Sequence, residues 1–370
     1  MKIVVLQDFL RSGGTERQSI LLARGFRARR QDVLLLTFRP GGPLLDTIDG
    51  VEHQSLQPLD LRWDWFAPAL TARIRHERPD VVLAMGRMAN CHLGFLSGAM
   101  RGRSGRPGVA VATFRTGKRL PWLFRRSLRL ADHVVANSHE AACRLREARR
   151  VPAERLSVIH NSLVFDGEAG IQPEAQRRED LRRRVGAGPD TAVLLCVAMF
   201  RPEKNQRGLI ETVSGLPAEA DWQLWLAGDG PARRGCEARV RELGLDRRVK
   251  FLGFTPDPEA LYAAADAAVH ASRSEALSNF LIEAQAHGLP AIAYEAQGVS
   301  ECFLPDQTGW TIGRDDCNAF RAAVVRLLGE PAAARRDRAA QARAFARDRF
   351  DPNRQIEAYL QLFGRLLGQR

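Results

Sequence analysis

Residues 2–38 read KIVVLQDFLRSGGTERQSILLARGFRARRQDVLLLTF, and this stretch decides the fold. Two continuous apolar runs, at 2–7 and 32–38, have the length and the Val and Leu content of buried strands. Between them, a loop at 8–14 leads into a segment with helical spacing of apolar residues, from about Thr15 to Arg29. Strands that are apolar on both sides occur in parallel sheets covered by helices on both faces. The stretch therefore predicts a β–α–β unit.

The same alternation continues along the chain and predicts two domains. The first series continues with strands expected at 80–85, 109–114, 133–138 and 156–162. A polar segment then precedes a second series, with strands expected at 191–200, 222–228, 249–254, 267–272, 291–294 and 309–313. This pattern predicts an α/β protein with two doubly wound, Rossmann-like domains facing a central cleft. We expect an N-terminal domain at 1–165, a linker at 166–190, a C-terminal domain at 191–350, and a helix at 351–370 that packs back on the body.

The composition is that of an ordinary globular protein, with 45% hydrophobic and 26% charged residues in 370. None of the six cysteines forms a C-x-x-C pair, so neither a zinc site nor a disulfide framework is indicated. The N-terminal apolar run is too short for a signal peptide, and no apolar stretch reaches the roughly 18 residues needed to span a bilayer. We therefore expect a cytoplasmic protein with reduced cysteines.

Arginine supplies most of the positive charge. Of the 55 basic residues only four are lysines, and the formal net charge is +12. A solvated, arginine-rich surface would explain this composition. Attraction to an anionic partner, such as nucleic acid, a membrane face or a phosphorylated substrate, would explain it as well. Charge alone does not choose among these readings.

Charged residues follow one strand of the second series. The sequence RPEKNQ after 191–200 places Arg201 and Lys204 just before a helix that starts near Asn205. An ammonium group at the carboxyl end of a strand suits a phosphate. The structural alternative is a surface salt bridge, for example with Glu203.

A second strand end carries two carboxylates. The sequence SRSEALSNFLIEAQA at 272–286 places Glu275 in a loop and Glu283 in a helix that begins near residue 278. A glutamate early in a helix often only complements the helix dipole, which would explain Glu283 but not Glu275. Two carboxylates beside an anion-binding helix start fit a nucleotide-sugar pocket. That anion site consists of the first-turn amides of Asn279, Phe280 and Leu281.

These motifs resemble those of a known family. The sequence SEALSNFLIEAQAHGLPAIA at 274–293 resembles the E-x7-E segment of the family 4, or group 1, glycosyltransferases, which have the GT-B fold. The segments at 197–205, 226–233 and 249–272 resemble neighbouring elements of that family in order and spacing. In the first half, SGGTERQ at 12–18 resembles the family's glycine-rich loop, and VIHNSLVF at 158–165 resembles the end of its first domain.

The resemblance implies retaining transfer of a sugar from a UDP- or GDP-sugar to a glycan or lipid-linked acceptor, without a bound metal. By position, Glu283 would hold the ribose hydroxyls and Glu275 the hydroxyls of the donor sugar. Lys204 would neutralise the diphosphate as it leaves. Gly13 and Gly14 would let the backbone of the acceptor-side N-terminal domain approach the donor closely. Synthesis of an envelope polysaccharide or lipopolysaccharide would fit such an enzyme.

Two departures from the family pattern bear on the site. The arginine that the family has five residues before the lysine is Met199 here, and we assign its charge to Arg201. Arg115 stands where the family often has a histidine, and is a candidate for binding an anionic acceptor or the donor phosphate. Leu83 and Met85 replace another common histidine pair. We assign no protein base, because the donor phosphate can accept the acceptor's proton.

The segment RTGKRLPWLFRRSLRL at 115–130 combines six basic residues with Trp122, Leu123 and Phe124. This pattern suits peripheral contact with an anionic membrane, at whose inner face the enzyme would meet a lipid-linked acceptor. A helix with a packed apolar face and a charged outer face is an equally weighted alternative.

Two other functions remain open at this point. A GT-B-fold nucleotide-sugar 2-epimerase shares the fold and the donor, but it needs acid/base carboxylates in the first domain, where no clear pair is visible. A basic nucleic-acid-binding protein would explain a pI of about 10.2. No recognisable nucleic-acid motif is present, so we expect no nucleic-acid partner.

Overall fold

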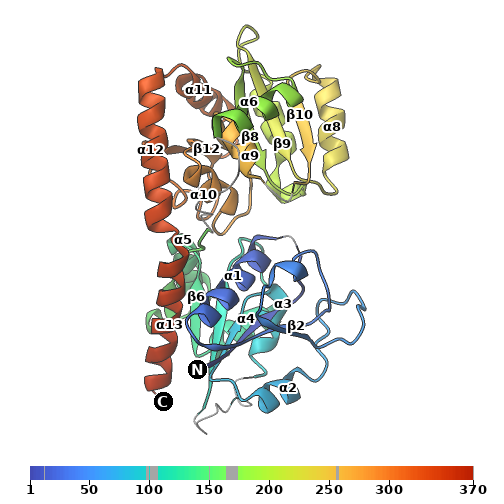
Figure 1. The fold of residues 1–370 in the computed structure, drawn as a ribbon, viewed down its shortest axis with the longest axis vertical. Coiled ribbons are helices and arrows are strands. Elements are labelled where there is room, and N and C mark those ends of the chain that lie inside the picture. Colours follow the sequence, from blue (N-terminus) through green and yellow to red (C-terminus); the bar gives the residue numbers. More distant parts are fainter. Residues whose placement is uncertain are drawn as a thin grey trace. The chain divides into compact units, whose positions relative to one another are not determined.

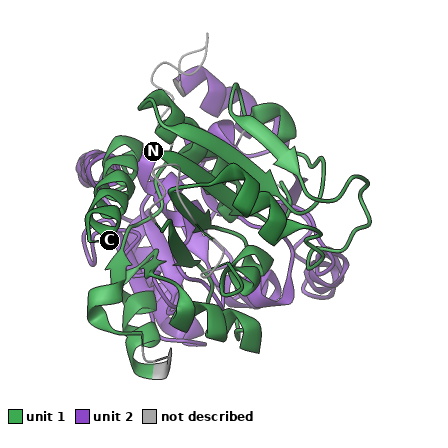
Figure 2. Cartoon of the chain, turned by 90° about the horizontal axis from the view of Figure 1, so that it is seen from below, with its two compact units in different colours: residues 1–164, 350–370 green, residues 165–349 purple. Residues whose placement is uncertain are grey.

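The computed structural model describes residues 1–11, 13–96, 100, 107–149, 151–163, 174–255 and 258–369. The chain divides into two compact units (Figure 2). The first unit consists of Met1–Val164 and Phe350–Arg370, and the second consists of Phe165–Arg349. The C-terminal segment thus belongs to the same unit as the N-terminus.

The first unit is built on a parallel sheet of seven strands in the order β3-β2-β1-β4-β5-β6-β7. Figure 1 labels β2 and β6 of this sheet. The strands are β1 (Lys2–Gln7), β2 (Asp32–Thr37), β3 (Glu52–Ser55), β4 (Val81–Ala84), β5 (Val109–Phe114), β6 (His133–Ala136) and β7 (Leu156–Val158). Its helices are α1 (Gly14–Ala28), α2 (Leu70–Glu77), α3 (Arg87–Leu93), α4 (Trp122–Leu130), α5 (His139–Arg149) and α13 (Pro352–Gly368).

Alternate residues of β1 enter two different cores. Val4 packs in the core that includes residues of α2, α3 and α4, whereas Ile3 and Val5 pack in the core that includes α1 and α13. All three side chains are fully buried. Burial on both faces explains why this strand is a continuous apolar run, as the sequence predicts.

The edge strand β3 is the one strand of the described residues that the sequence does not predict. Its residues, EHQS, are polar and none is buried. It pairs only with β2. An edge strand exposed in this way lacks the apolar run on which the prediction of strands depends.

The second unit has a parallel sheet of six strands in the order β10-β9-β8-β11-β12-β13. The strands are β8 (Ala192–Val197), β9 (Trp222–Ala227), β10 (Val249–Gly253), β11 (Ala267–His270), β12 (Ala291–Tyr294) and β13 (Gly309–Ile312). The helices are α6 (Glu174–Val185), α7 (Gln206–Val213), α8 (Arg233–Glu242), α9 (Glu259–Ala264), α10 (Asn279–Ala286), α11 (Cys317–Leu328) and α12 (Ala332–Arg349). The strand order reverses between β8 and β11, so their carboxyl ends form the switch point at which ligands of such sheets bind.

The described part of the expected linker, residues 174–190, belongs to the second unit. The guanidinium of Arg182 on α6 is buried, where it donates to the carbonyl of Ala264 (2.8 Å) and pairs with Asp266 (3.2 Å). Arg178 contacts the same carboxylate at 2.6 Å. Two arginines of this polar segment therefore anchor α6 to the second unit. Residues 166–173 lie outside the described ones.

The packing of α13 generates a test of this fold. Phe363 of α13 is fully buried against Phe26 of α1, with ring centroids 5.7 Å apart. We predict that Phe363→Ala lowers the free energy of unfolding by about 3–5 kcal/mol, measured by chemical denaturation. Gln361→Ala, at an exposed position of the same helix, should change it by less than about 0.5 kcal/mol. Equal losses in the two variants would contradict the packing.

Candidate active site

The loop after β8 is locked in place by the loop after β9. Gly228 and Gly230 have φ angles of +128° and +149°, which L side chains rarely adopt. A Cβ at these positions would lie 2.2 Å from the carbonyl oxygen of Ala198 and 2.5 Å from that of Phe200. The backbone amide of Phe200 also donates to the carbonyl of Asp229 (2.9 Å). This close backbone packing fixes the start of the segment that carries Arg201 and Lys204.

Lys204 ends a short 3-10 turn, Pro202–Lys204, and its ammonium forms an ion pair with Glu275 at 2.5 Å. The expected alternative partner was Glu203, but Glu203 has a different role through its backbone. Its carbonyl accepts hydrogen bonds from the amide of Arg273 (2.8 Å) and the hydroxyl of Ser272 (3.2 Å). The loops after β8 and β11 are thus joined by both backbone and side chains.

Glu275 is an ionised, buried carboxylate that is only 9% exposed. Burial raises the pKa of this group, but the Lys204 ammonium and a hydrogen bond from His270 outweigh that effect and lower the pKa to about 2. His270 Nε2 lies 3.0 Å from Glu275 Oε1, and because the carboxylate only accepts, Nε2 carries the proton. Glu275 therefore stays charged while it holds Lys204.

Helix α10 begins beside this pair, at the place that the sequence predicts. Its N-cap is Ser278, and the Ser278 side chain makes no capping hydrogen bond. The first turn contains no acidic residue, and the side chains of Phe280 and Leu281 are buried. The helix start is thus not neutralised by its own side chains, which is the arrangement that suits an anion.

Glu283 lies on α10, half-buried, and its Oε2 accepts a hydrogen bond from the hydroxyl of Tyr262 at 2.6 Å. The Tyr262 ring stacks on His287, with ring centroids 4.9 Å apart. These contacts hold the Glu283 carboxylate in one orientation. No hydrogen bond or ion pair of the Arg201 side chain is found among the described residues, and Arg201 is half-buried at the start of the 3-10 turn.

The structure shows which side chains contact Arg115. Its guanidinium donates to Asn161 Oδ1 (2.5 Å) and to the hydroxyl of Tyr359 on α13 (3.1 Å). Both partners lie in the first unit, so Arg115 ties the end of β5 to two distant segments. That Arg115 binds an anionic acceptor or the donor phosphate stays a prediction. In the same unit, Gly13 is the N-cap of α1 and Gly14 its first residue.

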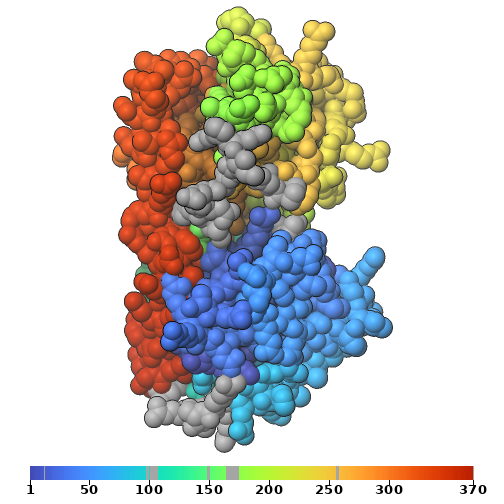
Figure 3. Space-filling model, in the orientation of Figure 1, coloured from blue at the N-terminus to red at the C-terminus, as the bar shows by residue number. Residues whose placement is uncertain are grey.

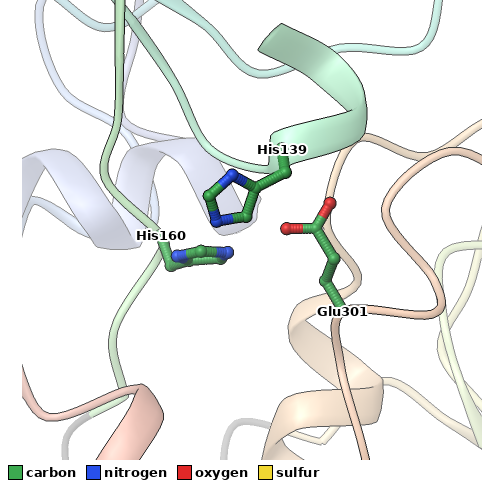
Figure 4. A group of neighbouring side chains, drawn as sticks. All are labelled: His139, His160 and Glu301. Atoms are coloured by element: carbon green, nitrogen blue, oxygen red, sulfur yellow. The ribbon is translucent and has the colours of Figure 1, made fainter. Parts of the chain in front are cut away.

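The first unit also holds two histidines that the sequence analysis does not single out. His139 begins α5 and His160 follows β7, with their rings turned toward one another and ring centroids 5.4 Å apart (Figure 4). Glu301, also drawn there, belongs to the second unit. Nothing in the residues around either histidine in the sequence signals the pair, because 21 positions separate them.

Asp8, at the end of β1, is a buried carboxyl group that the sequence analysis also passes over. It accepts hydrogen bonds from the amides of Met88 (3.0 Å) and Ala89 (2.6 Å). Burial outweighs these bonds and raises its pKa to about 6. The nearby Asp64 is ion-paired with Arg11 and Arg39. Asp8 thus binds two amides in the first turn of α3, and Asp64 is held by two arginines.

Comparison with known proteins decides the family. The model for "Glycosyl transferases group 1" matches residues 177–345, and the model for "Glycosyltransferase Family 4" matches residues 12–163. This chain is a group 1 glycosyltransferase. The expected family is therefore confirmed, and so is the GT-B fold, which HepE of Anabaena shares with a TM-score of 0.79 at 24% identity. That match covers 98% of this chain and 99% of HepE.

Two relatives of this glycosyltransferase come from Rhizobium meliloti. The lipopolysaccharide core biosynthesis glycosyltransferase LpsE is 24% identical over 326 residues, which are 87% of each chain. LpsD, which has the same description, is 33% identical over 181 residues, or 49% of this chain and 52% of LpsD. Among the described residues, no helix has the length and apolarity needed to cross a membrane.

The Lys204–Glu275 pair should make the stability of this glycosyltransferase depend on pH. Because the pKa of Glu275 is lowered from 4.5, its contribution is present above that value and is lost as the pH falls toward about 2. In Lys204→Met we expect the free energy of unfolding at neutral pH to fall by about 1–3 kcal/mol, measured by urea denaturation. The difference from the wild type should shrink below about pH 4.

The matched control is Lys250→Met, at a half-exposed position of β10. This variant should show no pH-dependent loss relative to the wild type. A loss in Lys204→Met that has the same size at neutral and acid pH would contradict the ion pair.

Proposed function

We propose that this glycosyltransferase moves a hexose from a UDP- or GDP-sugar to a glycan or lipid-linked acceptor, with retention of configuration and without a metal ion. The observation that carries the proposal is the Lys204–Glu275 ion pair beside the start of α10. A cation, an anion-binding helix start and a carboxylate occur together at the switch point of the second unit. These are the groups needed to bind a diphosphate and a sugar side by side.

The diphosphate is the leaving group, and negative charge develops on it as the glycosidic bond breaks. Lys204 neutralises that charge, and the amides of Asn279, Phe280 and Leu281 receive the phosphate oxygens. Arg201, which starts the same turn as Lys204, adds a second positive charge. With this charge supplied by the chain, the reaction needs no metal ion to stabilise the leaving group.

The two glutamates bind hydroxyl groups on opposite sides of the diphosphate. Glu275 orients the transferred sugar, and it remains ionised because Lys204 and His270 lower its pKa. Glu283 binds the ribose hydroxyls, since an ionised carboxylate accepts several hydrogen bonds and Tyr262 uses one of them. The family resemblance assigns Gly13 and Gly14 to the donor as well. The donor phosphate accepts the acceptor's proton, so no protein base is required.

The relatives support the choice of donor and acceptor. LpsE and LpsD are named for the biosynthesis of the lipopolysaccharide core, which favours an acceptor in an envelope glycolipid or polysaccharide. HepE was solved in complex with UDP and glucose, which favours a UDP-hexose among the possible donors.

If Lys204 binds the diphosphate and Glu283 binds the ribose, variants of the two residues should differ in their affinities for the nucleotide and the nucleoside. Lys204→Ala should weaken binding of UDP or GDP about tenfold to a hundredfold, because a charge-assisted contact with the diphosphate is lost. The same variant should bind the nucleoside, which has no phosphate, as tightly as the wild type. Glu283→Gln should weaken both ligands, because it acts on the ribose. Isothermal titration calorimetry measures each affinity, and Lys250→Ala is the control.

Equal binding of UDP and GDP by the wild type and Lys204→Ala would overturn the diphosphate site. The reaction itself is followed with labelled donor in the presence of a chelator. Loss of transfer in the chelator would contradict a metal-independent reaction. Interconversion of the donor in the absence of any acceptor would favour a 2-epimerase instead.

A further inference from the structure

The loop between β3 and α2 exposes apolar side chains, which a globular protein usually buries. Four apolar residues at alternate positions are exposed: Leu59, Leu61, Trp63 and Trp65. The tryptophans are 51% and 60% exposed, and their rings stack with centroids 5.8 Å apart. Figure 3 shows the blue segment around residues 50–70 at the surface of the first unit. Exposed apolar residues that are clustered in this way indicate an interaction surface.

Polar contacts hold this loop from its inner side. Arg39, which is largely buried, binds Asp60 (2.8 Å) and Asp64 (2.6 Å). Arg11 binds Asp64 as well, at 2.5 Å. The fully buried amide of Gln57 donates to the carbonyls of Trp63 (2.9 Å) and Phe66 (2.6 Å). The charged side chains thus support the loop while the apolar ones face outward, so the exposure of the tryptophans is built into the fold.

A hydrogen bond connects this loop to α3, and Phe95 in turn connects α3 to α4. His92 Nε2 on α3 lies 2.9 Å from the carbonyl oxygen of Trp65. Phe95 follows α3, is 53% exposed, and has the guanidinium of Arg126 over its ring at 5.2 Å. Trp122, at the start of α4, is 63% exposed. We call the exposed residues 59–65, Phe95, Trp122 and the basic residues of α4 the Trp–Arg surface.

The structure confirms the packed apolar face of the segment 115–130, and the membrane contact stays a prediction. Phe124 and Leu128 are buried in the core, as a packed helix requires. Trp122, Arg125 and Arg129 are exposed. The apolar residues therefore form the face of α4 that packs on the core. A tryptophan and two arginines lie on its exposed face.

The Trp–Arg surface is strongly cationic. The segment 115–130 contains six basic residues and no acidic one. The two acidic residues of the loop, Asp60 and Asp64, are both ion-paired with arginine. Arg62 and Arg87, on the loop and on α3, are exposed. No acid of these segments is left to balance the arginines.

We propose that the Trp–Arg surface binds the surface of an anionic phospholipid bilayer. Tryptophan favours the interface between head groups and acyl chains, and leucine gains free energy by entering the apolar layer. Arginines at the same level are attracted by lipid phosphates. A neutral sugar or an apolar protein groove would use the tryptophans but not the excess of arginine. This charge complementarity favours the membrane.

This inference rests on the proposed function in one respect only: membrane binding would bring the enzyme to a lipid-linked acceptor. Binding to a membrane needs neither a donor nor turnover. Vesicle binding and nucleotide binding can therefore fail independently, and the two proposals are tested separately.

The test is co-sedimentation of the full chain with phosphatidylcholine vesicles, with and without phosphatidylglycerol. The wild type should bind the anionic vesicles, bind neutral ones at least about tenfold more weakly, and lose binding as salt is added. The double variant Trp63→Ala/Trp65→Ala and the double variant Arg125→Gln/Arg129→Gln should each lose about tenfold or more in vesicle affinity. Both should keep the wild-type melting temperature and UDP affinity.

Matched controls come from the second unit. Phe254→Ala removes an exposed aromatic residue and Arg335→Gln/Arg336→Gln removes two exposed arginines, and neither should change vesicle binding. Wild-type affinity for anionic vesicles in the tryptophan double variant would overturn the proposal, as would failure of the wild type to bind them. Weaker binding of a soluble glycan or a protein by the tryptophan variant, with vesicle binding unchanged, would reassign the surface to that partner.

Discussion

The ion pair between Lys204 and Glu275 is the interaction on which the candidate site depends. It joins the loops after β8 and β11, which are the two strands on either side of the switch point of the second sheet. Removing one partner of a buried ion pair is destabilising, so the pair adds to the hydrogen bonds that already join these loops. His270 supports the same carboxylate from the strand itself. The pair therefore sets both the shape and the charge of the site before any ligand binds.

This arrangement has a chemical advantage for transfer from a nucleotide sugar. The Glu275 carboxylate holds the Lys204 ammonium in position at 2.5 Å. Because the Lys204 side chain is 27% exposed, it can also reach a ligand. Positive groups that are in place before charge develops stabilise a leaving group without further reorganisation. The backbone packing of Gly228 and Gly230 adds rigidity beneath the same loop.

Ion pairs also hold a loop of the first unit, but the exposed side chains of that loop are apolar. Arg39 binds Asp60 and Asp64, and these ion pairs hold a loop whose apolar residues face outward. In the second unit an ion pair holds Lys204 beside the start of α10, and in the first unit ion pairs hold a loop whose tryptophans are exposed. In both units, ion pairs fix the conformation of a loop and thereby determine which of its side chains are exposed.

The sheets could be predicted from the sequence because parallel strands buried on both faces are continuous apolar runs. β3 could not, since its polar residues lie at an edge. Lys204 and Glu275 were each predicted from their positions after strands, but their pairing was not, because they are 71 residues apart. The contacts of Arg115 could not be predicted for the same reason, because its partners Asn161 and Tyr359 are 46 and 244 residues away. Single positions relative to a strand or helix are local and predictable, whereas contacts between loops are not.

A structure of this chain with UDP or GDP bound would show whether the Lys204–Glu275 pair marks the diphosphate site. We predict that the diphosphate lies within hydrogen-bond distance of the Lys204 ammonium and the first amides of α10, and that Glu283 contacts the ribose. A diphosphate bound elsewhere in the second unit, with Lys204 still paired only to Glu275, would contradict this assignment.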